Sequence, residues 1–176
     1  MEITAVRSTC ASNYTLSNWT IDDIVFCVAI ELPLQPPVPG GLCAIPAGTY
    51  RVIIERSPNF SQLAGHDVFL PHLYDLPGYT TSFHGLALDN CGILIHGGNV
   101  VNGIPKCQPG GPQPGPYSVK DPLRTDSEGC LLVGTDFGDD KKSIINSQIA
   151  LAKLKERIQG AGRAGQLVSI TLMDKT

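Results

Sequence analysis

Polar and apolar residues alternate over short stretches in the first three quarters of the chain, a pattern typical of β-strands buried on one face. The alternation predicts strands over residues 2–8, 13–19 and 24–32. A Pro/Gly turn that feeds a run of β-branched and aromatic residues predicts a hairpin over residues 43–56. The prolines and glycines of residues 57–82 favour a long surface excursion without regular structure.

The helical pattern comes late in the chain. Apolar residues recur at helical spacing from residue 143 to about 158, and Gly160 is expected to stop that helix. Residues 167–173 then alternate as a final strand. Many strands, one C-terminal helix and a closing strand predict a mostly-β fold, a sandwich or partial barrel, formed as a single domain over residues 1–176.

Composition removes several classes of partner. Charged residues make up 16% of the chain and the formal net charge is -3, so nothing favours nucleic acid or an anionic membrane. The first residues lack the basic and apolar regions of a signal peptide, and no run of about 18 apolar residues occurs. The expectation is a protein synthesised in the cytoplasm, with a peptide or small molecule as its partner; the sequence leaves the oligomeric state undecided.

The six cysteines have wide, irregular spacings, and no C-x-x-C pair is present. Since the chain is long enough for an apolar core without disulfides, we expect mostly reduced thiols. Cys27, inside an apolar strand, is most simply a small buried hydrophobe. A zinc site built from His84, Cys91, His96 and Cys130 lacks a close ligand pair, so no metal or other cofactor is expected.

Two motifs carry the candidate chemistry. His96 and two glycines end one apolar strand, and Cys130 directly follows a glycine and opens another, so the sequence predicts a base and a nucleophile at equivalent strand ends. Gly97 allows a substrate backbone to approach, and Gly129 would leave nearby peptide N–H groups accessible as an oxyanion site. The alternative is structural: a histidine with its hydrogen bonds satisfied and a core cysteine.

Further polar residues are candidates for a substrate-binding wall. The Gly/Pro-rich residues 97–129 are expected to form a long loop over the site. Within or near the loop lie His84, Asn99, Asp126 and Glu128, and an arginine on an earlier strand, Arg51, would suit a substrate carboxylate. Each has an ordinary alternative role, as a loop cap, a backbone-bonded histidine or a strand-surface residue.

The order of strand, Ile-His-Gly, Pro/Gly-rich loop, Ser-x-Gly-Cys and strand resembles the catalytic core of the L,D-transpeptidases, bacterial cysteine enzymes that remodel peptidoglycan stem peptides. This resemblance implies Cys130 as nucleophile, His96 as base, the Gly97 carbonyl as orienter of the imidazole and Gly129 as part of the oxyanion site. The chain departs from the family pattern at Glu128, where a histidine is usual, and in the 34-residue interval from His96 to Cys130.

Four ordered runs, AIPAGTYRV, PHLYDLPGY, IHGGN and EGCLLVG, resemble an uncharacterised family of small domains found in bacteria and their phages. That resemblance implies an L,D-transpeptidase-like fold more than an activity. The leading hypothesis is a cysteine-dependent acyl transferase or peptidase acting on peptidoglycan-type peptides. A non-catalytic binding or phage structural module and a small-molecule sequestering protein remain alternatives.

Overall fold

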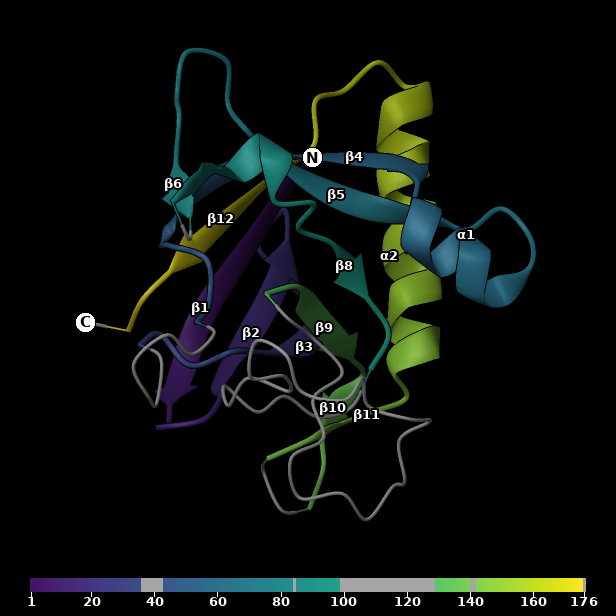
Figure 1. Ribbon diagram of the computed structural model, residues 1–176. Helices are drawn as coiled ribbons and strands as arrows, with labels where there is room; N and C mark the ends of the chain where they lie inside the picture. Colours follow the sequence, from purple (N-terminus) through teal and green to yellow (C-terminus); the bar gives the residue numbers. More distant parts are fainter. Residues whose placement is uncertain (36–42, 84, 99–128, 140–141, 176) are drawn as a thin grey trace, which may run out of the picture.

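The computed structural model describes residues 1–35, 43–83, 85–98, 129–139 and 142–175 (Figure 1). Their architecture is a curved sheet of eight strands with one long helix packed on it. Two small two-stranded ribbons and a short helix complete the described fold. The elements are β1 (Glu2–Cys10), β2 (Thr15–Ile21), β3 (Ile24–Glu31), β4 (Gly48–Arg56), α1 (Pro58–Ala64), β5 (Phe69–Asp75), β6 (Ser82–Phe83), β7 (Leu86–Ala87), the 3-10 turn η1 (Leu88–Asn90), β8 (Ile95–His96), β9 (Leu131–Gly134), β10 (Asp136–Phe137), β11 (Ile144–Ile145), α2 (Ser147–Arg163) and β12 (Ser169–Met173).

The large sheet has the strand order β5-β4-β12-β1-β2-β3-β9-β8 and nearly closes into a barrel. Its two outermost strands meet where His72 on β5 bridges Leu94, and the Leu73 N–H donates to the Ile93 carbonyl at 2.9 Å. Only two of the pairings in this sheet, β1 with β12 and β8 with β9, are parallel. The mostly-β expectation is confirmed, in its barrel form.

The main core lies between one face of the sheet and α2. Alternate residues of β1 point into it, and α2 contributes an apolar stripe that packs against β4, β8 and β9. In Figure 1 the helix stands along one side of the sheet. A smaller cluster on the other face lies beneath the β10–β11 ribbon; its buried members are Leu16, Ile30, Leu32, Leu132 and Ile144.

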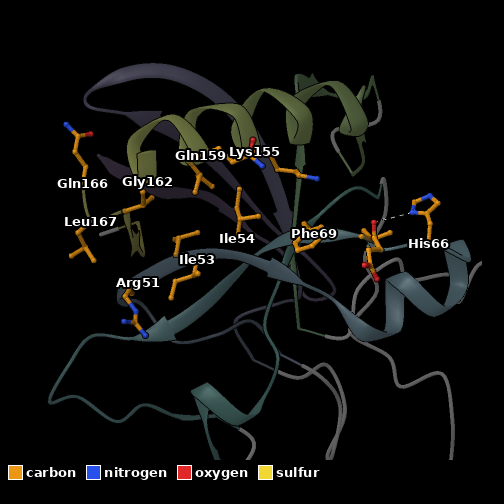
Figure 2. A pocket seen from close by; sticks show the side chains of 15 residues that line it. Arg51, Ile53, Ile54, His66, Phe69, Lys155, Gln159, Gly162, Gln166 and Leu167 are labelled. Atoms are coloured by element: carbon orange, nitrogen blue, oxygen red, sulfur yellow. Dashed lines mark hydrogen bonds between the residues drawn. The ribbon is translucent and has the colours of Figure 1, made fainter. Parts of the chain in front are cut away.

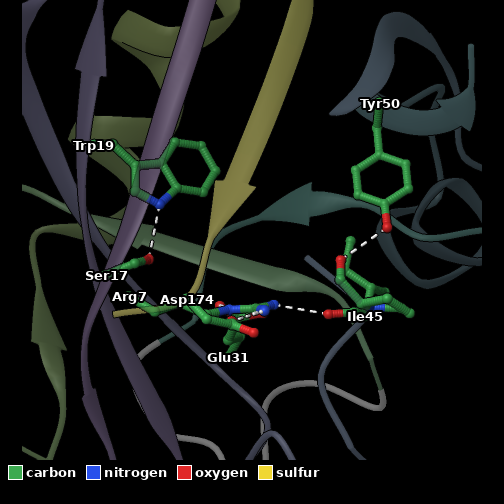
Figure 3. A network of polar contacts seen from close by, with 8 residues as sticks. Arg7, Ser17, Trp19, Glu31, Ile45, Tyr50 and Asp174 are labelled. Carbon is green, nitrogen blue, oxygen red and sulfur yellow. Dashed lines mark hydrogen bonds and ion pairs between the residues drawn. The ribbon is translucent and has the colours of Figure 1, made fainter. Parts of the chain in front are cut away.

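Arg7 occupies a core position of β1 and is 1% exposed. Glu31 is the last residue of β3. Its carboxylate accepts hydrogen bonds from the Nε and Nη2 atoms of Arg7, both at 2.8 Å (Figure 3). The same guanidinium donates to the Ile45 carbonyl at 2.8 Å and to Asp174 at 2.7 Å. One side chain therefore ties together β1, β3, the segment before β4 and the segment after β12.

Three expectations about local structure were wrong. Residues 43–56 do not form a hairpin, because β4 pairs with β12 and β5 instead of the residues just before it. Residues 57–82 are not irregular throughout, because they contain α1 and β5. Pro58 occupies the first turn of α1, where proline is favoured, and Pro71 lies in β5, an outermost strand of the sheet, where proline is tolerated. The long helix runs through Gly160 to Arg163, because tertiary packing of its later apolar residues outweighs the low helix propensity of glycine.

Candidate active site

The parallel pairing of β8 with β9 brings the two motif residues together. His96 lies opposite Leu132, and the Leu131 N–H donates to the Leu94 carbonyl at 2.9 Å, which places Cys130 beside Leu94. His96 and Cys130 therefore lie on adjacent chain segments, two residues apart in the register. A strand spacing of about 4.8 Å and a rise of about 3.3 Å per residue separate the Cα atoms of such neighbours by about 8 Å.

The prediction that these residues occupy equivalent strand ends was wrong. His96 ends β8, whereas Cys130 precedes β9, and in a parallel pair these are opposite ends. They are close neighbours because β8 is only two residues long.

His96 is 5% exposed, and its surroundings fix its orientation. Its Nδ1 atom lies 2.7 Å from the Gly97 carbonyl oxygen. Since a carbonyl only accepts hydrogen bonds, this contact requires the proton on Nδ1 and leaves Nε2 as the basic ring nitrogen. The Phe60 ring of α1 packs against the imidazole at a centroid distance of 4.9 Å and an angle of 53°.

Cys130 is half-buried at the edge of the core. Its Sγ atom accepts a hydrogen bond from the Leu94 N–H at 3.4 Å. A donor aimed at sulfur favours the thiolate over the thiol, because it interacts more strongly with the charged form. The strand that carries His96 therefore also supplies a stabilising contact to Cys130.

The two glycines of the site have different structural roles. Gly129 has φ +137°, a backbone conformation that residues with a side chain rarely adopt. The position directly before Cys130 therefore favours glycine. At Gly97 an added Cβ would lie 2.3 Å from the side-chain nitrogen of Gln148, in the first turn of α2. The peptide after His96 therefore packs closely against the start of the long helix.

The structure adds a second histidine that the sequence analysis did not single out. His72 bridges Leu94 from the other side, which brings β5 next to the residue whose N–H contacts Cys130. Its Nδ1 atom lies 3.2 Å from Glu55, which also accepts a hydrogen bond from the Tyr74 hydroxyl. Burial lowers the pKa of His72 despite the opposing charge of Glu55, which favours the neutral form of the ring. No local pattern in the sequence marks this residue as a neighbour of the site, because the bridge joins two segments that are distant in sequence.

Arg51 lies apart from the Cys130 neighbourhood. On this side of the sheet, β5 and β8 separate its strand, β4, from β9. The guanidinium stands 5.7 Å from the centre of the Tyr74 ring and lines a groove between β4 and α2 (Figure 2). Its predicted contact with a substrate carboxylate would therefore be made in that groove.

The four other predicted substrate-binding residues, His84, Asn99, Asp126 and Glu128, lie outside the described residues. The same holds for residues 99–128 of the predicted loop over the site. The positions of His96, Gly97, Gly129 and Cys130 therefore define the described part of the candidate site.

Other cysteines have environments unlike that of Cys130. Cys27 is 4% exposed, and burial raises the pKa of its thiol to about 12, as expected for a small buried hydrophobe. Cys91 donates to the carbonyls of Phe83 and Ala87 at 3.6 and 3.4 Å, and burial raises its pKa. Both thiols are kept protonated at neutral pH.

Comparisons of the chain with protein-family models, curated proteins and solved structures found no match. Among the described residues, no group of three or more His, Cys, Asp and Glu side chains is arranged to hold a metal ion. Within that same part of the chain, no helix has the length and apolar character needed to cross a membrane.

Proposed function

We propose that this protein is a cysteine-dependent acyl transferase or peptidase that acts on peptidoglycan-type peptides. The observation that carries the proposal is the parallel pairing of β8 with β9, which brings His96 within two register positions of Cys130, with the imidazole held by the Gly97 carbonyl. Held in this way, Nε2 is the nitrogen that takes the proton from the thiol. The Leu94 N–H supports the resulting thiolate.

In the proposed reaction, the Cys130 thiolate attacks a peptide carbonyl carbon and forms a C–S bond. The C–N bond then breaks, and the leaving amine takes the proton from the His96 imidazolium. Water or a second amine then attacks the thioester carbonyl carbon and gives up its proton to His96. The C–S bond breaks, the acyl group leaves, and the Cys130 thiolate takes that proton from His96, which restores the thiol. The choice between water and an amine distinguishes peptidase from transferase activity.

The substrate class comes from the resemblance of the Ile-His-Gly and Gly-Cys motifs to the L,D-transpeptidases. In that family the substrates are the stem peptides of peptidoglycan, which is why we propose peptides of this type as the substrate class.

A non-catalytic binding or phage structural module is the second candidate. The observation that favours it is the low exposure of His96, whose ring is covered by Phe60. A histidine in this setting can also serve as a polar residue satisfied by backbone.

The test is the rate of alkylation of each cysteine as a function of pH, read by peptide mass spectrometry. In the proposed enzyme Cys130 is alkylated rapidly at pH values well below the ordinary thiol pKa of about 8.5. His96→Ala should slow this reaction to the rate of an ordinary thiol. His66→Ala is the matched control, because His66 is exposed and bonds the backbone of Asp67. His72→Gln tests whether the second imidazole contributes.

Muropeptides incubated with the wild type and with Cys130→Ala then test the chemistry itself. Cleavage or exchange lost in Cys130→Ala supports the enzyme. If Cys130 reacts no faster than an ordinary exposed thiol and the muropeptides stay unchanged, the enzyme proposal fails and the binding module replaces it.

A further inference from the structure

One edge of β4 lacks a strand partner over its second half. On one side β5 pairs with β4 from Tyr50 to Arg56, whereas on the other side β12 pairs only from Gly48 to Arg51. The last backbone contact on the β12 side is the Val52 N–H donating to the Val168 carbonyl at 2.9 Å. Peptide groups of alternate residues point the same way, so those of Ile54 and Arg56 also face away from β5.

This edge borders a groove of about 830 Å³, and α2 forms its opposite wall. Figure 2 shows the helix running beside β4, with Ile54 between them. The lining is apolar at its centre, and three apolar side chains of the lining are exposed: Ile53 at 36%, Phe69 at 46% and Leu167 at 62%. A groove between an unpaired strand edge and a helix has the shape that accepts one additional strand.

The charges in the groove favour an acidic occupant. Asp67, its one carboxylate, pairs with Arg56 at 2.5 Å. Lys155 and Arg51 make no ion pair within the described part of the chain, and the buried Nε of Arg51 lacks a hydrogen-bond acceptor there. Two cationic groups therefore remain for a ligand carboxylate.

We propose that this groove binds an extended, acidic peptide segment that adds as a strand to the free edge of β4. The peptide backbone pairs with Ile54 and Arg56, an apolar side chain packs between Ile54 and Ile158, and a carboxylate reaches Lys155 or Arg51. Neither His96 nor Cys130 lines the groove, so binding here does not depend on the acyl-transfer chemistry.

Two glycines of α2 supply a matched pair of variants. A Cβ added at Gly162 or at Gly160 meets nothing within 4 Å, so both helical positions accept a larger side chain. Gly162 lines the groove, whereas Gly160 lines a separate depression near Met1 and Ile21. Leucine at either position raises helix propensity by a similar amount, but only Gly162→Leu fills the groove.

The probes are a synthetic library of fluorescein-labelled pentapeptides, each with alternating apolar residues and terminal Asp or Glu. Fluorescence anisotropy should detect saturable binding to the wild type and to Cys130→Ala alike. Gly162→Leu should weaken the best binder at least about tenfold, a change of about 1.4 kcal/mol, while Gly160→Leu stays within about twofold. Lys155→Gln should weaken acidic peptides and leave neutral versions of the same peptides unaffected.

Hydrogen exchange gives the second readout, because strand addition should protect the amides of Ile54 and Arg56 in the presence of the best binder. N-methylation of alternate peptide nitrogens should abolish both binding and protection. The proposal is overturned if no acidic library member binds, if lysine-ended peptides bind equally well, or if Gly162→Leu binds like the wild type.

Discussion

Replacing Glu31 by glutamine should strongly destabilise the fold, because it leaves the Arg7 charge buried without its counter-charge. The side chains of this pair are 1% and 2% exposed, so neither reaches water. Glutamine keeps one acceptor oxygen and presents an amide N–H₂ where Arg7 needs the second acceptor. Breaking a buried ion pair in this way costs about 3–5 kcal/mol, a large part of the about 5–15 kcal/mol that stabilises a typical domain.

The remaining partners of Arg7 compensate only in part. The Ile45 carbonyl still accepts one hydrogen bond, but it carries no charge. Asp174 carries a charge but is 50% exposed, so water screens its interaction with the guanidinium. Asp174→Asn is therefore the matched control, since it removes a carboxylate from the same arginine and should cost at most about 1 kcal/mol.

Urea unfolding at neutral pH measures the difference. For a slope of about 2 kcal/mol per M, Glu31→Gln should lower the midpoint by about 2 M and Asp174→Asn by less than about 0.5 M. The double variant Arg7→Met with Glu31→Leu removes both charges and should recover much of the loss. The reasoning is refuted if Glu31→Gln costs no more than Asp174→Asn, or if the double variant is no more stable than Glu31→Gln.

Two other stability measurements test separate features. Gly134→Ala should lower the free energy of unfolding by about 1–3 kcal/mol in a denaturant titration, because the added Cβ would lie 2.7 Å from the Cβ of Ile144 and 2.8 Å from a β11 carbonyl oxygen. Gly97→Ala should cost less, because its Cβ meets only the movable end of the Gln148 side chain. Equal losses for the two variants would contradict the packing argument. Burial raises the pKa of Cys27 from 9.0 to about 12, so its contribution to stability is complete below pH 9 and is lost as pH rises toward 12. The free energy of unfolding should therefore fall more steeply above pH 9 in the wild type than in Cys27→Ala, by up to about 1.4 kcal/mol per pH unit, and parallel curves would show that Cys27 ionises equally in both states.

Local periodicity predicted most of the elements correctly. The alternation over residues 2–8 and 24–32 and the helical spacing after residue 143 correspond to β1, β3 and α2, because each pattern records which side of an element meets the core. It failed at α1 and β5, where prolines that break other structures occupy positions that tolerate them.

The candidate site was only partly accessible to the same reasoning. His96 and Cys130 were singled out because each stands next to a glycine at the boundary of an apolar strand. His72 was missed, because its place beside Leu94 depends on β5 meeting the segment before β8 across the opening of the barrel. No local pattern reports which distant strands meet.

The sequence by itself determined the mostly-β class, the late helix and the two motifs, since these depend on neighbours within a few residues. Tertiary structure alone decided the parallel register that joins β8 to β9, the burial of Arg7 with Glu31 and the unpaired edge of β4. Each of these depends on where the chain closes on itself. Closure is set by the packing of residues far apart in sequence, so the nearest neighbours of a residue do not reveal it.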